Sequence, residues 1–335
     1  MSSEPPPNPA RVLVTGATGL VGSALCRTLA RSGYRVRRAL RTRAPAGYDD
    51  VVVGDIGADT NWSAALAGVD AVVHLAARTH VLEKRDAKAA AAYQRVNVGG
   101  TRRLAEQAAA AGVRRFVFLS SVKVNGEATS GRGFQETDPP CPENPYGRTK
   151  REAEDLLFAL ARESALEVVV IRSPLVYGPG VKGNFERLMR YVARRFPLPL
   201  GSVDNRRSLI YVGNLADAIL KCLERVEANG RVYLVSDGED MSTPELLRAV
   251  GHALHVEPFI VPFPVAWLRG LAGMTGRSAE LARLAGSLVV DTTRIRRELG
   301  WTPPYSAADG LRATAEWYHS RVNDRARADE AHRAL

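Results

Sequence analysis

The chain has 335 residues, of which 45% are hydrophobic, so it can bury a sizeable core and is not expected to be disordered. Its net charge of +10 would suit an anionic partner, but Lys and Arg alternate with Asp and Glu along the helical stretches. That pattern is typical of a generally basic surface and gives no indication of nucleic-acid binding. Three widely spaced cysteines without metal-ligand spacing indicate a reduced, cytoplasmic protein with no metal site.

The first half of the sequence alternates short apolar runs with longer helical stretches. The runs expected to form strands are residues 12–14, 36–40, 51–53, 71–75, 116–119 and 168–171. Their continuous apolar character is typical of parallel strands buried on both faces. Between them, residues 20–32 and 93–111 are expected to form helices, each followed by a glycine. The pattern predicts an α/β fold with a Rossmann doubly wound parallel sheet over residues 11–175.

The remaining segments flank this domain. Residues 1–10 are rich in proline and are expected to form a disordered tail, not a signal peptide, and residues 321–335 a charged tail. Residues 176–320 are expected to form mainly a smaller substrate-binding lobe, from which some strands return to the sheet. In this lobe, Ser242 and Glu245 form a helix start signal. Residues 259–274 are apolar but broken by prolines and an arginine, and fall short of the roughly 18 to 20 apolar residues of a membrane-spanning helix.

That apolar segment is expected to form ordinary core and lid helices. The alternative is a helix that lies on a membrane and admits a lipid-linked sugar, because basic residues follow the segment.

A glycine-rich turn follows the first predicted strand. Gly16, Gly19 and Gly22 stand at spacing Gly-x-x-Gly-x-x-Gly, with Thr18, Leu20 and Val21 between or beside them. Without a β-carbon, these positions permit a tight turn, approach of backbone N–H groups to a pyrophosphate, and close packing of helix on strand. Because a helix follows, the pyrophosphate of a dinucleotide is expected at its N-terminus.

The end of the second strand bears on the choice of cofactor. Folds that prefer NAD place an acid there to hold the ribose 2′-hydroxyl, whereas this chain has several arginines. We therefore expect NADP(H), with Arg41 at the 2′-phosphate, although NAD(H) stays open. Asp55, next to Ile56 after the third strand, is placed to reach the adenine amino group.

Tyr146 and Lys150 stand four residues apart at the start of a predicted helix that Asn144 can cap. A neighbouring ammonium favours a phenolate, so Lys150 is expected to lower the pKa of Tyr146 and to hold the nicotinamide ribose. Tyr146 then gives or takes a hydroxyl proton as hydride moves. Ser120 and Ser121 end a buried strand at the edge that faces the ligand crevice, where a serine hydroxyl can polarise a carbonyl.

Together these residues resemble the extended short-chain dehydrogenase/reductase family, in its nucleotide-sugar epimerase and dehydratase group. The resemblance covers residues 12 to about 317 and includes His74 with Leu75, Ala76 and Ala77, then Asn97, Ser121, Tyr146, Lys150, Pro174 and Trp301. It implies that Ser121, Tyr146 and Lys150 are catalytic, that residues 75–77 form a wall of the cofactor pocket, and that Asn97 is a buried polar anchor. The predicted cofactor site comprises Gly16, Thr18, Gly19, Leu20, Val21, Gly22, Arg41, Asp55, Ile56, Leu75, Ala76, Ala77, Asn97, Tyr146, Lys150 and Pro174.

The resemblance also implies a nucleotide-sugar substrate and a homodimer. Arg207 matches the arginine that lies at the substrate diphosphate, and Asn184 and Lys123 are further candidates for substrate binding. Dehydratases of the group follow the catalytic hydroxyl with Asp-Glu, but this chain has Val122 and Lys123, which argues against dehydration.

Hydride transfer at sugar C4 of a UDP-N-acetylhexosamine or a 6-deoxy 4-keto sugar, in surface polysaccharide synthesis, is therefore the favoured reaction. Within it, 4-keto reduction is placed slightly ahead of 4-epimerisation, because the arginines after the second strand suit an exchanging NADPH. A reductase of non-sugar ketones and a catalytically silent, NADP-sensing regulator are the alternatives.

Overall fold

A computed structural model describes residues 10–43, 48–79, 87–276 and 278–333. Almost all of the N-terminal tail expected at residues 1–10 lies outside these ranges. No helix in the described ranges combines the length and the apolar character needed to cross a bilayer.

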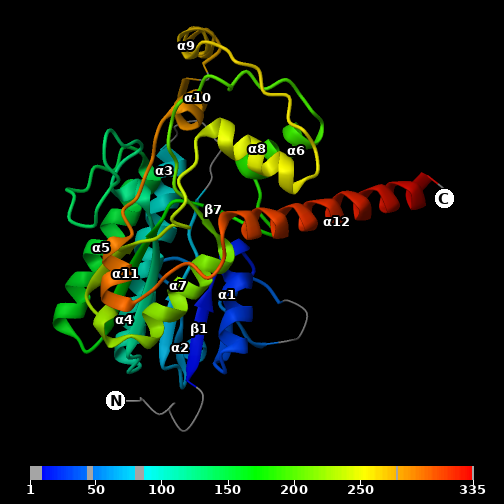
Figure 1. The fold of residues 1–335 in the computed structure, drawn as a ribbon. Coiled ribbons are helices and arrows are strands. Elements are labelled where there is room, and N and C mark those ends of the chain that lie inside the picture. The colour runs from blue at the N-terminus through cyan, green and yellow to red at the C-terminus, as the bar shows by residue number, and fades with distance from the viewer. Residues whose placement is uncertain (1–9, 44–47, 80–86, 277, 334–335) are drawn as a thin grey trace.

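A seven-stranded parallel sheet forms the centre of the molecule, in the order β3-β2-β1-β4-β5-β6-β9 (Figure 1). Its strands are β1 (Arg11–Thr15), β2 (Arg35–Leu40), β3 (Asp49–Val52), β4 (Ala71–His74), β5 (Arg115–Ser121), β6 (Glu167–Ser173) and β9 (Arg231–Leu234). The first six correspond to the six predicted runs, and the order confirms the doubly wound Rossmann fold. The seventh, β9, returns to the sheet from the second half of the chain.

Helices cover both faces of this sheet. One face packs against α1 (Leu20–Arg31), α7 (Val212–Glu224) and α11 (Thr293–Leu299), with Trp301 fully buried beside them. The other face packs against α2 (Ser63–Leu66), α4 (Thr101–Ala110) and α5 (Pro145–Glu163). Because β1, β4, β5 and β6 are buried on both sides, their residues are apolar without alternation.

The second lobe lies beyond the carboxyl ends of the strands. Strands β7 (Leu175–Tyr177) and β8 (Leu209–Tyr211) form a separate two-stranded parallel sheet. The core of the lobe lies between α6 (Asn184–Ala193), α8 (Thr243–Ala253) and α12 (Ala307–Arg333). The predicted start of α8 is confirmed, because Ser242 and Glu245 form a reciprocal capping box. Helix α12 continues to Arg333, through residues expected as a charged tail.

The helix expected over residues 93–111 differs from the prediction. It consists of α3 (Ala87–Tyr93), a π-helical segment (Gln94–Gly100) and α4. A β-carbon at Gly100 would lie 2.4 Å from the Ile56 side chain, so the chain passes Ile56 at a distance that only glycine allows. The wider turn also carries Asn97 toward the interior, where its side chain is 1% exposed.

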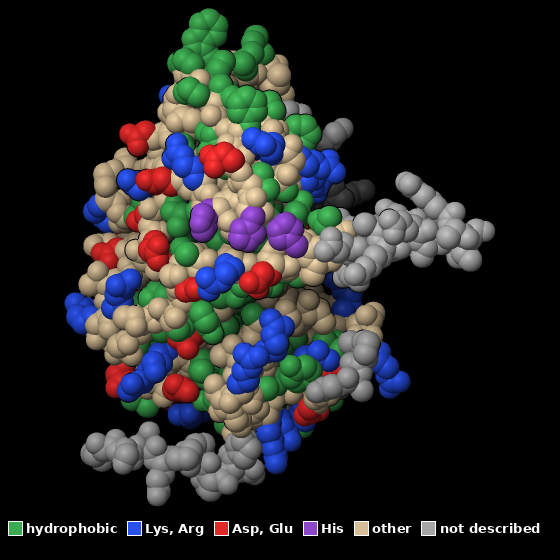
Figure 2. All heavy atoms as spheres, turned by 45° about the vertical axis from the view of Figure 1, so that its right-hand side comes forward, with side chains coloured by type: hydrophobic (Ala, Val, Ile, Leu, Met, Phe, Trp, Pro, Cys, Tyr) green, Lys and Arg blue, Asp and Glu red, His purple; other side chains and the backbone are tan. Residues whose placement is uncertain are grey.

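The apolar segment over residues 259–274 was expected to form core and lid helices, and its helix does not lie in the core. Helix α9 (Val265–Met274) and helix α10 (Ser278–Ala285) stand at the apex of the second lobe (Figure 1). In α9 only Ala272 is buried. Figure 2 shows hydrophobic side chains gathered at this apex.

Candidate active site

The turn between β1 and α1 has the geometry of a phosphate cradle. Gly16 adopts a φ of +66°, and a β-carbon there would lie 2.9 Å from the Ala76 amide nitrogen. A β-carbon at Gly22 would lie 2.2 Å from the Gly16 carbonyl oxygen. Gly19 is the N-cap of α1, without a side-chain cap and without an acid in the first turn of the helix. The N–H groups of α1 therefore stay available to an anion such as a dinucleotide pyrophosphate.

Residues 75–77, the predicted cofactor wall, lie directly beside this turn. The Thr15 hydroxyl accepts hydrogen bonds from the backbone N–H groups of Leu75 and Ala76, both at 3.1 Å. The same hydroxyl is 2.7 Å from Nδ1 of His74, whose Nε2 is 3.0 Å from the Thr101 hydroxyl. Burial lowers the pKa of His74 to about 3, so the ring is neutral and links β1, β4 and α4 structurally.

Asn97 ties the wall to the helix of the predicted catalytic residues. Its Oδ1 accepts from the Arg78 backbone N–H at 2.8 Å, and its Nδ2 donates to the Thr149 hydroxyl at 3.1 Å. The side chain is thus placed as the buried polar anchor that the resemblance implied.

Ser121, Tyr146 and Lys150 meet at the carboxyl edge of the sheet. Asn144 caps α5 as predicted, because its Oδ1 accepts from the Gly147 N–H at 2.8 Å. This cap places Tyr146 in the first turn of α5, where a side-chain hydrogen bond from Ser121 reaches the phenol. One turn later, the Lys150 ammonium donates to the Leu119 carbonyl at 2.7 Å and lies 4.2 Å from the centre of the Phe118 ring.

The electrostatics of this cluster correct one expectation. Burial and the neighbouring Tyr93 raise the pKa of Tyr146, and only the Ser121 hydrogen bond lowers it. Lys150 does not contribute to this shift in the pKa of Tyr146. Its ammonium instead donates a hydrogen bond to the Leu119 carbonyl. Burial instead lowers the pKa of Lys150 itself to about 7. The proton on Lys150 is therefore easily lost near neutral pH.

A buried ion pair supports the cluster from behind, and sequence reasoning did not assign it. Glu154, one turn after Lys150, pairs with Arg172 of β6 at 2.6 Å, and both side chains are at most 2% exposed. The Ser120 hydroxyl donates to Glu154 at 2.5 Å, and Arg172 also donates to Asn125. The signal available in the sequence was a glutamate four residues after the lysine.

Glu127 is a second residue of the site that sequence reasoning missed. Its carboxylate accepts from the Lys123 ammonium and from the Asn144 amide that caps α5. It also counteracts the burial that lowers the pKa of Arg207. Glu127 therefore links two predicted substrate residues, Lys123 and Arg207, to the helix of Tyr146.

The other predicted substrate residue lies apart from this network. Asn184 is exposed at the first turn of α6, where its Oδ1 accepts from Arg187 at 3.1 Å.

Arg207 is held by the backbone at the end of α10. It donates through Nη1 to the carbonyls of Arg283 and Gly286, at 2.7 and 2.8 Å. The end of α10 therefore positions the guanidinium of Arg207.

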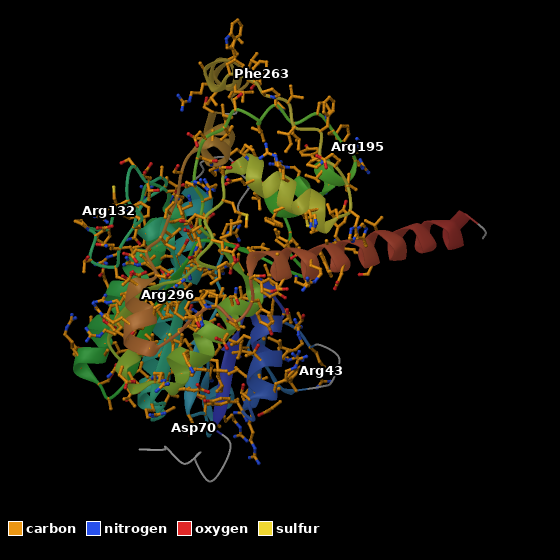
Figure 3. All side chains as sticks on the ribbon, in the orientation of Figure 1. Arg43, Asp70, Arg132, Arg195, Phe263 and Arg296 are labelled. Carbon is orange, nitrogen blue, oxygen red and sulfur yellow. The ribbon has the colours of Figure 1, made fainter. Side chains whose placement is uncertain are left out.

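The arginines of β2 have partners that the linear sequence does not reveal. Arg37 and Arg38 face Asp49 and Asp50 across the parallel register with β3 and pair with them at 2.8 and 2.5 Å. Arg41 pairs with Asp55 at 2.8 Å, with both side chains exposed. The two side chains expected at the 2′-phosphate and at the adenine thus contact each other. Figure 3 shows Arg43 at the outer side of the same edge, beside α1.

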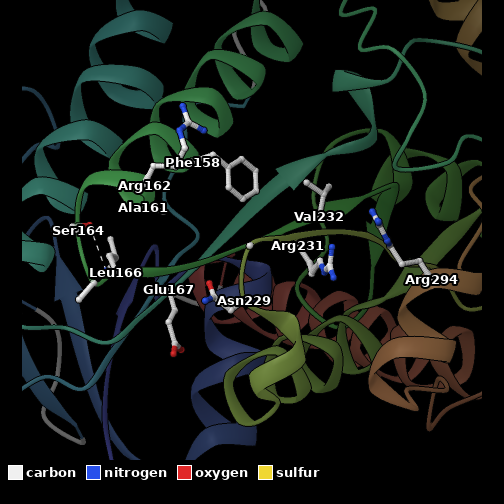
Figure 4. A pocket seen from close by; sticks show the side chains of 12 residues that line it. Phe158, Ala161, Arg162, Ser164, Leu166, Glu167, Asn229, Arg231, Val232 and Arg294 are labelled. Carbon is white, nitrogen blue, oxygen red and sulfur yellow. Dashed lines mark hydrogen bonds between the residues drawn. The ribbon is translucent and has the colours of Figure 1, made fainter.

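A hollow in the described surface lies at the opposite edge of the sheet. It has a volume of about 710 Å³ and is lined by the end of α5 and the starts of β6 and β9 (Figure 4). In parallel α/β sheets, ligands bind at the carboxyl ends of strands, and these are the amino ends. Asp70, which precedes β4, marks the same amino edge in Figure 3. We therefore do not assign this hollow to the active site.

The Rossmann fold, with Ser121, Tyr146 and Lys150 at one edge of its sheet, is that of an enzyme of the extended short-chain dehydrogenase/reductase class. The sequence model of the NAD dependent epimerase/dehydratase family matches residues 12–236. The chain belongs to this family, which confirms the resemblance found in the sequence.

Individual relatives agree with this assignment over nearly the whole chain. A UDP-glucose 4-epimerase of Vibrio cholerae is 44% identical, over 92% of this chain and 95% of the relative. An N-acetyl-alpha-D-glucosaminyl-diphospho-ditrans,octacis-undecaprenol 4-epimerase of Escherichia coli O157:H7 is 28% identical, over 93% of this chain and 97% of the relative. Among solved structures, MoeE5 in complex with UDP-glucose and NAD superposes with a TM-score of 0.76 at 28% identity, over 93% of this chain and all of MoeE5.

Proposed function

We propose that the protein interconverts the C4 epimers of a UDP-sugar, with Tyr146 as the proton-transferring residue. The observation that carries this proposal is the hydrogen bond between Ser121 and Tyr146 at the sheet edge that faces the glycine turn. The 44% identity to a UDP-glucose 4-epimerase supports the choice of reaction. The sequence placed 4-keto reduction slightly ahead of 4-epimerisation, and we now place 4-epimerisation first.

In the proposed reaction, Tyr146 takes the proton of the sugar 4-hydroxyl as C4 is oxidised to the ketone. It returns the proton to the same oxygen when C4 is reduced on its opposite face. Ser121 donates a hydrogen bond to the developing carbonyl oxygen. A nicotinamide dinucleotide supplies the hydride acceptor and donor at C4. Lys150 holds the nicotinamide ribose and, with its pKa near 7, can exchange a proton at neutral pH.

The nicotinamide cofactor fits the β1–α1 turn, with its uncapped helix N-terminus and the wall of residues 75–77. We assign NAD as the working cofactor, because MoeE5 binds NAD and because Arg41 is paired with Asp55. A measured preference for NADP that Arg41→Ala abolishes would restore the earlier assignment of Arg41 to a 2′-phosphate.

For the diphosphate we propose Arg207, held by the end of α10 and close to Glu127. Lys123 and Asn184 complete the proposed substrate contacts. Because MoeE5 is seen in complex with UDP-glucose, and because relatives are 4-epimerases of a glucose and an N-acetylglucosamine derivative, UDP-glucose and UDP-N-acetylglucosamine are the compounds to test first.

The decisive experiment is incubation of the purified protein with each UDP-sugar in the absence and presence of added NAD. We expect conversion to the galacto epimer with no net change in cofactor absorbance. If neither compound changes while NADPH is consumed on a 4-keto-6-deoxy UDP-sugar, 4-keto reduction is the activity. Arg43, which is exposed after β2, is what favours this second candidate.

The Tyr146→Phe variant tests the assignment of the proton-transferring residue. Loss of general acid–base catalysis typically lowers a rate by about 10² to 10⁴, so we expect kcat to fall by that factor. Dinucleotide binding, followed by fluorescence titration, should change little, because the glycine turn is untouched. Unchanged turnover would remove Tyr146 from the mechanism.

A further inference from the structure

Helix α9 presents an apolar face to solvent at the apex of the molecule. Trp267, Leu271 and Met274 stand at positions i, i+4 and i+7 and share that face. Their side chains are 69%, 48% and 79% exposed. Phe259, in the strand-like segment that leads to α9, is exposed as well. A cluster of exposed large apolar side chains on one face marks a contact surface.

The segment of sequence that carries this face has a positive net charge. Residues 259–285 contain three arginines and one glutamate, which leaves a net charge of +2 within a chain of net charge +10. The segment of residues 198–201 pairs with residues 259–262, and exposed Arg194 and Arg195 precede it. An amphipathic helix with Trp and Leu on one face and cations around it matches the chemistry of an anionic lipid surface.

The shape of the apex fits a bilayer better than a second copy of the chain. Helix α9 has 10 residues, which makes it about 15 Å long at about 1.5 Å per residue. One face of such a helix is far smaller than the roughly 800 Å² per partner that a stable protein interface buries. Figure 2 shows hydrophobic side chains at the narrow tip of the molecule.

We propose that the apex formed by α9 and residues 259–263 docks peripherally on an anionic lipid bilayer. Trp267, Leu271 and Met274 enter the interfacial region, and the surrounding arginines contact lipid phosphates. The docked face lies at the end of the molecule opposite Asp70, as Figure 3 shows with Phe263 and Asp70 at opposite ends. The catalytic edge of the sheet therefore faces the membrane side. This inference goes beyond the proposed function and stands without it.

The test is sedimentation of the full-length protein with two kinds of vesicle. One kind is phosphatidylcholine alone, and the other also contains about a third of the anionic lipid phosphatidylglycerol, which attracts basic segments. We expect the protein to sediment with the anionic vesicles at low salt. The double variant Trp267→Ser/Met274→Ser should lose binding by about tenfold or more, because interfacial binding scales with buried apolar area.

The matched control is Val226→Ser, since Val226 is 66% exposed and lies in the short helix of residues 226–228, away from the apex. It should bind vesicles like the wild type, and all three proteins should turn over a soluble UDP-sugar equally. A blue shift of the Trp267 emission on adding anionic vesicles, missing in Trp267→Phe, would support insertion. Of the other three tryptophans, Trp62 and Trp301 are fully buried and Trp317 is half-buried, and the Trp267→Phe variant measures their combined emission.

Two outcomes would overturn the proposal. The first is vesicle binding that is absent at low salt or equal for the wild type and the double variant. The second is a concentration-dependent molecular mass that the double variant alone lowers, which would make the face an interface between copies of the chain.

Discussion

Lys150 is a cation held in the interior of the protein. Lys150 is 1% exposed, and its ammonium contacts the Leu119 carbonyl and the Phe118 ring. Burial lowers its pKa from 10.5 to about 7, opposed by Glu154. The unfolded chain, in which the lysine titrates normally, therefore binds more protons than the folded chain between pH 7 and pH 10.

This difference predicts the direction in which stability depends on pH. The contribution of Lys150 to the free energy of unfolding rises with pH across that window and is smallest below pH 7, where both states are protonated. Between pH 7 and pH 9 the wild type should gain about 2 kcal/mol relative to Lys150→Met. Urea unfolding of both proteins at the two pH values measures the gain. An equal pH dependence in both would mean that Lys150 titrates normally in the folded state.

At the level of elements, the β1–α1 turn depends on the absence of a side chain at Gly22. Gly22→Ala would place a β-carbon 2.2 Å from the Gly16 carbonyl, so the backbone of the cradle must shift. We expect dinucleotide affinity to fall at least about tenfold, as the N–H groups move away from the pyrophosphate. Fluorescence titration with NAD measures this change. Gly270→Ala, where a β-carbon meets no atom within 4 Å, is the matched control and should bind NAD normally.

The cap of α5 combines a structural and a catalytic role. Asn144→Ala removes the hydrogen bond to the Gly147 N–H and the contact with Glu127, at an expected cost of about 1 kcal/mol in the free energy of unfolding. Because Tyr146 lies in the first turn of this helix, kcat should fall more than KM changes.

Ser242→Ala is the control for this prediction, since Ser242 caps α8 by the same chemistry in the second lobe. It should lose similar stability in urea unfolding and keep its kcat. A kcat reduced equally in both variants would show that the effect of Asn144 is only global destabilisation.

On the scale of the whole molecule, the Glu154–Arg172 pair joins α5, β5 and β6 behind the catalytic cluster. Removing one partner of a buried pair leaves an uncompensated charge, so Glu154→Ala should cost about 3 to 5 kcal/mol in the free energy of unfolding. The double variant Glu154→Ala/Arg172→Ala should cost less than the two single variants added together. Urea unfolding of all four proteins measures the coupling, and simple additivity would contradict it.

The sequence by itself determined the Rossmann fold, because parallel strands buried on both faces appear in the sequence as continuous apolar runs. The glycine turn is also predictable, because the steric requirement for glycine at Gly16 and Gly22 is local. The cap by Asn144 and the four-residue spacing of Tyr146 and Lys150 are likewise local to one helix. These features required no knowledge of distant neighbours.

Only the tertiary structure decided which charges meet. The sequence predicts Arg41 at a 2′-phosphate, but in the structure Arg41 pairs with Asp55, and the register of β2 with β3 places Asp49 and Asp50 opposite Arg37 and Arg38. The depressed pKa of Lys150, the position of Glu127 and the exposure of α9 follow from contacts and burial set by residues far away in the chain. Electrostatic and solvation energies depend on three-dimensional distance, which a linear pattern of residues does not contain.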